Sequence, residues 1–178
     1  QSLAMSWLVL SLTSPAIKLS LVNVLQFAPT LFLGLFAGVV ADRVPKRSLL
    51  VVTQSIAALS SATLAYLIWT GNIDLWHVYL VALIVGINNS FDMPSRQAFV
   101  SEMVGREDLA NAIALNSTLF NMGRLVGPAL AGIVLGVFGV AACFLIDAVS
   151  YLAVICSLLL MRNLPKVRAP RNRKPIES

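Results

Sequence analysis

Residues 34–47, GLFAGVVADRVPKR, change character halfway along, and this change decides the fold. The first eight residues are apolar or glycine. Asp42 follows, and three of the next five residues, Arg43, Lys46 and Arg47, are basic. A long apolar segment that ends in a cluster of charge is typical of a membrane helix reaching the polar edge of the bilayer.

The composition of the whole chain agrees with a lipid environment. Of its 178 residues, 58% are hydrophobic and only 12% are charged, whereas a soluble domain carries about 25% charged residues. The net charge of +5 would suit a nucleic-acid partner only if the basic residues shared one solvated face. Here apolar runs separate them, so we expect the lipid bilayer as a partner and no nucleic acid.

The uncharged runs give the number of helices, because a spanning helix needs about 20 mostly apolar residues. Spans are predicted at residues 18–41, 48–70, 75–93, 110–138 and 141–161. Residues 1–12 are apolar but reach only about 18 Å as a helix, so we interpret them as the end of a first span whose start is missing. The predicted fold is an all-α, polytopic membrane helix bundle over 1–161, with five complete transmembrane helices plus the end of a first.

The connections indicate the orientation. Eleven of the 13 Lys and Arg residues fall in the alternate connections 42–47, 94–109 and 162–178, and basic loops face the cytoplasm. Within the second of these, residues 95–111 are predicted to form a short amphipathic helix on the inner membrane face. The last, 162–178, has three prolines and six basic residues and is predicted to be a basic cytoplasmic linker.

Two motifs carry a resemblance to a known family. Six helices with a charged connection between the second and third resemble the N-terminal half of a major facilitator superfamily transporter. The loop motif of that family is matched by Gly38, Asp42, Arg43, Lys46 and Arg47, with Pro45 where the family usually has glycine. The stretch GRLVGPALAG at 123–132 is similar to the fifth-helix motif of proton-driven antiporters, and its matching or enclosed residues are Gly123, Arg124, Gly127, Pro128 and Gly132.

With DMPSRQAFV at 92–100 added, the chain most resembles the transmembrane secretion effector branch, which includes enterobactin exporters. The resemblance implies a multi-pass protein of the bacterial inner (plasma) membrane and a missing C-terminal six-helix half. It further implies alternating access and export of small amphipathic molecules, such as a drug or a siderophore, with the proton gradient as energy source. No cofactor and no metal site are expected.

The charge cluster has two separable roles. Gly34 and Gly38 place a GxxxG ridge on the second helix, and Asp42 lies on the same face one turn further. There its carboxylate can meet a helix N-terminus in one conformation only, as an inner gate contact. The plainer interpretation, which we favour for Lys46, is that the basic residues merely set topology.

Arg124 is the sharpest single residue, because it lies close to the middle of the span 110–138, where a charge is costly. Asp147 lies at a different depth, which argues against a simple pair, whereas Asn88, Asn89 and Asp92 are nearer in depth. Pro128 is expected to bend the fifth helix at Arg124, whose carbonyl loses its donor.

The other polar residues within spans are candidates for a cavity or a proton relay. Asn23 and Gln26 could line a cavity or form helix–helix hydrogen bonds. Asp147 could carry a proton or be a satisfied structural acid. Two alternatives to proton-coupled export stay open: a non-transporting membrane sensor or scaffold of the same fold, and an importer or facilitator. An enzyme is not expected, since no titratable cluster converges at one depth.

Overall fold

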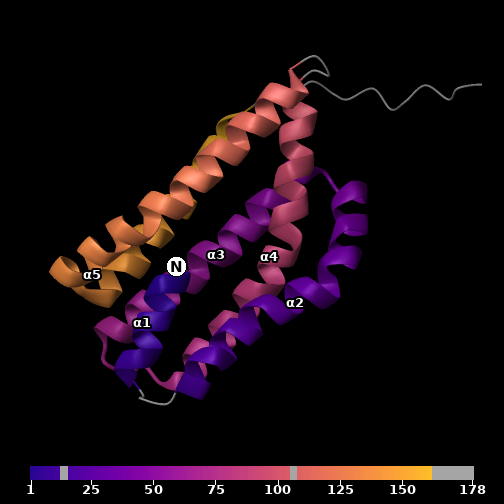
Figure 1. Ribbon diagram of the computed structural model, residues 1–178. Helices are drawn as coiled ribbons and strands as arrows, with labels where there is room; N and C mark the ends of the chain where they lie inside the picture. Colours follow the sequence, from indigo (N-terminus) through magenta and orange to yellow (C-terminus); the bar gives the residue numbers. More distant parts are fainter. Residues whose placement is uncertain (13–15, 105–107, 162–178) are drawn as a thin grey trace, which may run out of the picture.

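The protein is described by a computed structural model that covers residues 1–12, 16–104 and 108–161. The described residues form α-helices joined by short connections (Figure 1). The helices are α1 (Ser2–Leu12), α2 (Ala16–Arg43), α3 (Lys46–Trp69), α4 (Leu75–Met103) and α5 (Leu109–Leu160). The prediction of an all-α membrane helix bundle is confirmed. The predicted linker 162–178 lies outside the described residues.

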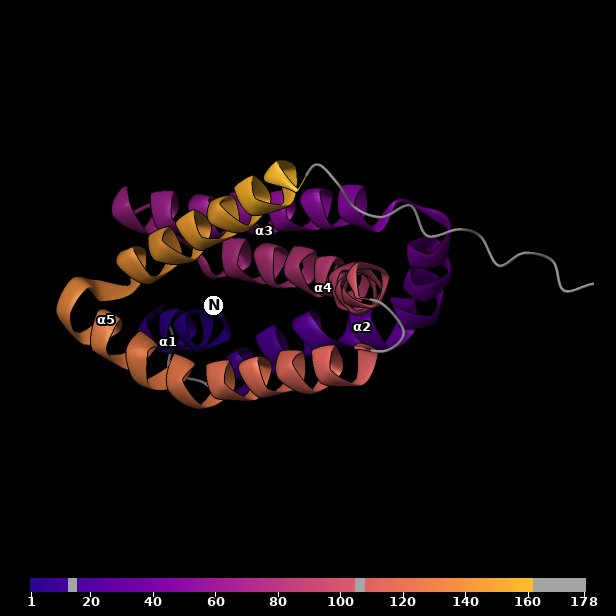
Figure 2. The ribbon, with the colours of Figure 1, turned by 90° about the horizontal axis from the view of Figure 1, so that it is seen from above.

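Helix α5 consists of two arms that fold back at Gly139. This glycine has φ 80° and ψ 178°, the non-helical angles inside α5, and that combination is essentially restricted to glycine. Figures 1 and 2 show the first arm (residues 109–138) running the length of the molecule and the second arm (140–160) returning. The two arms are the predicted spans 110–138 and 141–161.

Length and composition identify the helices that could cross a membrane. In the described part of the chain these are α2 from Ile17, α3 and the 52-residue α5. Helix α1, with 11 residues, is too short, as predicted. Helix α4 was predicted to span at 75–93 but falls outside this group, because His77, Asn88, Asn89 and Asp92 lower its hydropathy.

The prediction of a separate amphipathic helix at 95–111 is wrong. Helix α4 continues through Pro94 as far as Met103, and residues 105–107 lie outside the described part. The continuation is explained by Phe99, which is buried in a small cluster with Leu50 of α3 and Leu158 of the second arm. This burial holds the end of α4 against the bundle, whereas an interfacial helix would turn its apolar face toward lipid.

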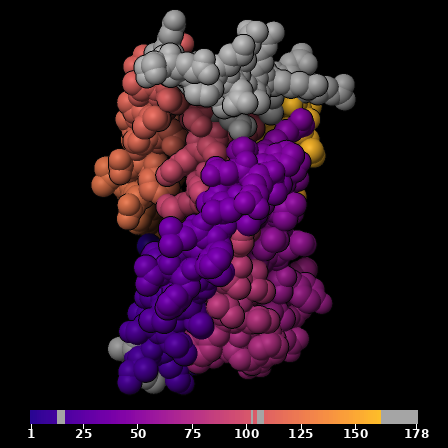
Figure 3. Space-filling model, turned by 90° about the vertical axis from the view of Figure 1, so that its right-hand side faces the viewer, coloured from indigo at the N-terminus to yellow at the C-terminus, as the bar shows by residue number. Residues whose placement is uncertain are grey.

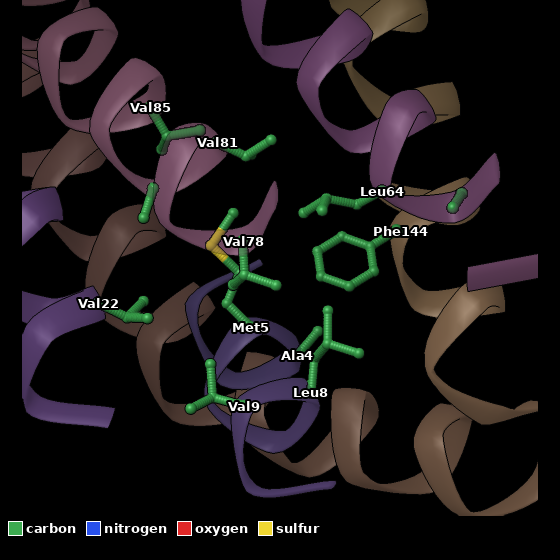
Figure 4. Packing of buried hydrophobic residues seen from close by; sticks show 12 residues of the cluster. Ala4, Met5, Leu8, Val9, Val22, Leu64, Val78, Val81, Val85 and Phe144 are labelled. Atoms are coloured by element: carbon green, nitrogen blue, oxygen red, sulfur yellow. The ribbon is translucent and has the colours of Figure 1, made fainter. Parts of the chain in front are cut away.

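The main core lies where α1 meets α2, α3, α4 and the second arm. Figure 4 shows Met5 and Leu8 of α1 facing Leu64 of α3, Val78 of α4 and Phe144 of the second arm. Met5, Leu64, Val78 and Phe144 are fully buried. Because this core uses side chains from both ends of the sequence, α1 is an integral part of the bundle.

Helices α2 and α4 lie side by side along one face of the molecule (Figure 3). They approach each other closely at Gly86, where a Cβ atom would lie 2.6 Å from the carbonyl oxygens of both Leu25 and Gln26. Pro29, inside α2, lacks the N–H that would bond the Leu25 carbonyl. Only a residue without a side chain allows this approach.

Much of the surface is apolar. Leu31, Leu35 and Leu125 are about four-fifths exposed, at 79%, 86% and 80%, and exposed apolar surfaces of this extent are typical of proteins that face lipid. The first arm of α5 is exposed along nearly its whole length. Leu3 and Trp7 of α1 lie opposite the first arm, and α1 lies between the two arms (Figure 2).

Candidate functional site

The charge cluster forms a tight turn between α2 and α3. Helix α2 ends at Arg43 and α3 begins at Lys46, so that only Val44 and Pro45 connect them. Pro45 has φ −56° and ψ 114°, close to the fixed φ of proline. The turn therefore differs from one built on a left-handed glycine.

Arg47 joins this turn to the far end of the chain. Its Nε donates to the Leu158 carbonyl at 2.8 Å, and its Nη2 donates to the Leu159 carbonyl at 2.9 Å. The last carbonyls of a helix have no donor within the helix, and a guanidinium can satisfy two of them at once. Sequence reasoning missed this contact, because 111 residues separate Arg47 from Leu158.

Asp42 is exposed at the end of α2. Its backbone carbonyl accepts from Lys46 Nζ at 3.3 Å, while its carboxylate has no partner among the described residues. The ridge above it is equally open, because a Cβ atom on Gly34 or Gly38 would meet nothing within 4 Å. The predicted close approach of another helix to this face is thus not made by any described helix.

Asp92 is held by three side chains between α3 and α4. Its Oδ1 accepts from Thr53 Oγ1 and Gln54 Nε2, each at 2.8 Å, and its Oδ2 forms an ion pair with Arg96 at 3.2 Å. These contacts hold the carboxylate in place between the two helices. Asp92 is therefore not the partner of Arg124.

Asp147 of the second arm is bound by a different part of α3. Its Oδ2 accepts from Ser61 Oγ at 2.7 Å, and Ser61 also accepts from Gln1 Nε2 at 3.2 Å. Gln1 Oε1 in turn accepts from Tyr151 at 3.2 Å. The network ties α1, α3 and the second arm together, and it makes Asp147 a hydrogen-bonded carboxyl without a basic partner among the described residues.

The sequence analysis singled out four amide side chains, and the structure does not bring them together. They are Asn23, Gln26, Asn88 and Asn89. Asn23 and Asn89 are exposed, whereas Gln26 donates from Nε2 to the Met5 sulfur at 2.9 Å. Asn88 is only 6% exposed, and its buried Oδ1 has no hydrogen-bond partner in the described structure. Asn88 lines an apolar cavity of about 400 Å³ between α2, α3 and α4, together with Thr53 and Phe91.

Arg124 is exposed on the first arm. The Arg124 Cζ lies 5.8 Å from the ring centroid of Phe120, one turn back on the same helix. No carboxylate of the described residues pairs with it, neither Asp147, which the sequence argued against, nor Asp92. Leu109 and Gly139 are each 15 positions away, so Arg124 occupies the middle of the arm.

The small residues around Arg124 are likewise open. A Cβ atom on Gly123, Gly127 or Gly132 would meet nothing within 4 Å. Helix α5 continues through Pro128, and the expected bend there stays a prediction. Gly86, which sequence reasoning passed over, is instead the glycine in tight contact with a neighbouring helix.

Comparison with known proteins identifies the family of this chain. The family model described as transmembrane secretion effector matches residues 1–176. The chain belongs to this family. The assignment confirms the resemblance to major facilitator transporters, and the chain is an integral membrane protein.

Curated relatives of this secretion effector chain include transporters of several kinds. The staphyloferrin A transporter of Staphylococcus aureus is 30% identical over 96% of this chain and 44% of its own length. The multidrug efflux pump Tap of Mycolicibacterium fortuitum is 29% identical over 76% of this chain and 34% of its own. The enterobactin exporter EntS of Salmonella paratyphi A is 28% identical over 79% and 34%.

The chain thus spans less than half the length of these relatives. No solved structure matches it significantly. The family consists of transporters, which confirms the prediction that the chain is not an enzyme.

Proposed function

We propose that this chain works as one half of a secondary active transporter in the bacterial inner membrane, with its basic connections in the cytoplasm. The transporter exports small amphipathic molecules such as drugs or siderophores by alternating access, in exchange for protons. Relatives with efflux and exporter names support the direction, and the antiporter-like stretch 123–132 supports the coupling.

The observation that carries this proposal is the open space beside the small residues of the two motif helices, α2 and α5. A Cβ atom on Gly34, Gly38, Gly123 or Gly127 would meet nothing within 4 Å, and the exposed Asp42 carboxylate has no partner among the described residues. Small residues in membrane helices allow close helix contact. A second six-helix half packed against these faces would complete the bundle, and relatives more than twice as long leave room for it.

Alternating access requires contacts that form in one state and break in the other. Asp42 is suited to this role, because its carboxylate is exposed at a helix end while Arg47 beside it is already engaged with α5. The motif is then divided between a fixed contact within this half, made by Arg47, and a switching contact to the other half, made by Asp42.

The test is accumulation of a fluorescent amphiphile, ethidium, in an efflux-deficient bacterial host that expresses the protein. We expect expressing cells to hold less ethidium than the empty host, and a protonophore to remove the difference. Asp42→Asn should raise accumulation toward the host level, whereas Arg43→Lys should not. Equal accumulation in expressing and empty cells would favour the sensor or scaffold, and higher accumulation would favour an importer.

A further inference from the structure

Arg124 carries a positive charge far from both ends of a membrane-spanning helix. It lies at the middle of an apolar membrane helix, about 22 Å along the axis from either end, and no described acid neutralises it. The Phe120 ring at 5.8 Å is a weak partner in comparison with a carboxylate. A charge at this depth normally pairs with another group or faces a water-filled cavity.

The face that carries Arg124 also carries other polar groups. Ser117, Asn121, Arg124 and Pro128 follow one another at intervals of four, three and four residues, and therefore share one side of the helix. Ser117 and Asn121 are exposed like Arg124. Two hydrogen-bonding side chains one and two turns from the guanidinium extend the polar site along this face.

An apolar pocket continues the same face toward Gly139. Pro128 and Leu135 line a cavity of about 210 Å³ together with Gly132, Gly136 and, from α1, Leu3 and Trp7. A cavity of about 150 Å³ is enough to hold benzene, so this one accommodates a single aromatic ring. Pro128 follows Arg124 by four residues, about 6 Å along the axis.

We infer that Arg124 and this pocket form a binding site for an organic anion with one aromatic ring. The acid group, a carboxylate or sulfonate, binds the guanidinium with Asn121 and Ser117 beside it. The ring enters the pocket between Trp7 and Pro128. The inference rests on the proposed function, since it assigns the proposed exporter a binding site for one class of molecule, besides cations such as ethidium.

Two other sources of negative charge fit less well. A lipid headgroup lies at the bilayer surface, too far from the middle of a spanning helix for an arginine side chain. An acid from a second half could pair with Arg124, but such an ion pair would require neither the polar side chains next to it nor an aromatic-sized pocket. The site therefore favours a ligand over a structural partner.

The test compares two probes of similar shape and opposite charge, 4-phenylbutyrate and 4-phenylbutylamine. Equilibrium dialysis measures their binding to the full-length protein in phosphatidylcholine nanodiscs, with empty nanodiscs subtracted. Arg124→Gln should weaken phenylbutyrate binding roughly 10- to 100-fold, the value of a charge-assisted hydrogen bond, and leave phenylbutylamine unchanged. Arg124→Lys should retain part of the binding, and the control Lys18→Gln all of it.

A second variant keeps the inference testable if Arg124→Gln does not fold. Trp7→Ala enlarges the pocket and should weaken both probes alike, because it removes ring contacts without changing charge. Equal binding of the two probes to the unmodified protein, or no effect of Arg124→Gln, would overturn the inference and point to a structural ion pair. Ethidium efflux that persists in that case would leave the proposed export function standing.

Discussion

The guanidinium of Arg47 binds the carbonyls of Leu158 and Leu159 at 2.8 and 2.9 Å, and so joins the turn between α2 and α3 to the end of the second arm. This contact connects the charged motif with the last described helix before the basic segment 162–178. The contact therefore attaches the turn to the end of the bundle.

Replacing Arg47 should loosen that end. We expect Arg47→Ala to lower the free energy of unfolding by about 1 kcal/mol, since a charged hydrogen bond contributes about 1.5–3 kcal/mol and partial exposure weakens it. Arg43→Ala, at an exposed position of the same motif, is the matched control and should cost less than half as much. Unfolding in sodium dodecyl sulfate mixed micelles measures both, and equal losses would contradict a specific role for Arg47.

The three carboxylates should respond differently to conversion into amides. The Asp92 carboxylate accepts from three side chains, and in Asp92→Asn the new NH₂ group faces one of these donors. We expect the substitution to lower the free energy of unfolding by about 2 kcal/mol. Asp147→Asn, at a carboxyl group that accepts from Ser61, should lower the free energy of unfolding by about 1 kcal/mol. Asp42→Asn should leave stability unchanged while it impairs efflux. A stability loss at Asp42 as large as that at Asp92 would show that Asp42 is structural.

Gly86 should tolerate no side chain. In Gly86→Ala the new Cβ would meet two backbone carbonyl oxygens at 2.6 Å, so α2 and α4 must separate, at a cost of roughly 1–3 kcal/mol. Gly132→Ala, a helical position with open space, should instead be neutral or stabilising by up to about 1 kcal/mol. The same unfolding assay separates the two, and a neutral Gly86→Ala would show that the helices are not in tight contact.

Gly139 should be required for the reversal between the arms. Its φ of 80° is strained for any residue with a Cβ, so that Gly139→Ala should cost about 1–3 kcal/mol. Gly136→Ala, one turn earlier in helical conformation, is the control. A double-cysteine distance measurement between the arms would report opening of the hairpin, and an unchanged distance together with unchanged stability would refute the requirement.

The parts of the fold that depend on local sequence were predictable. The lengths of the apolar runs located the helices, and the break near residue 139 separated the arms, because both signals lie in consecutive residues. The extension of α4 past Pro94 was missed, since it depends on burial of Phe99 against α3 and the second arm. A proline often marks the end of a helix, but here tertiary packing keeps α4 helical beyond Pro94.

The sequence was sufficient to name the residues of the candidate site but not the groups that they contact. Asp42, Arg124 and Asp147 stood out because charges within apolar runs are rare. Their partners did not, because Ser61 lies 86 residues from Asp147 and the contacts of Arg47 are equally remote. Nothing in the sequence around Gly86 distinguishes this glycine, which is in tight contact with α2, from the glycines whose surroundings are open.

The most direct test of the central claim, proton-coupled export, uses everted membrane vesicles that contain the full-length protein. Respiration acidifies their interior, and a pH-sensitive dye follows the proton gradient while ethidium is added. The account predicts that ethidium accumulates inside the vesicles and that the gradient partly collapses, both effects being absent with Asp42→Asn and present with Arg43→Lys. Vesicles that neither accumulate ethidium nor release protons in response to it, while the protein is folded and inserted, would contradict it.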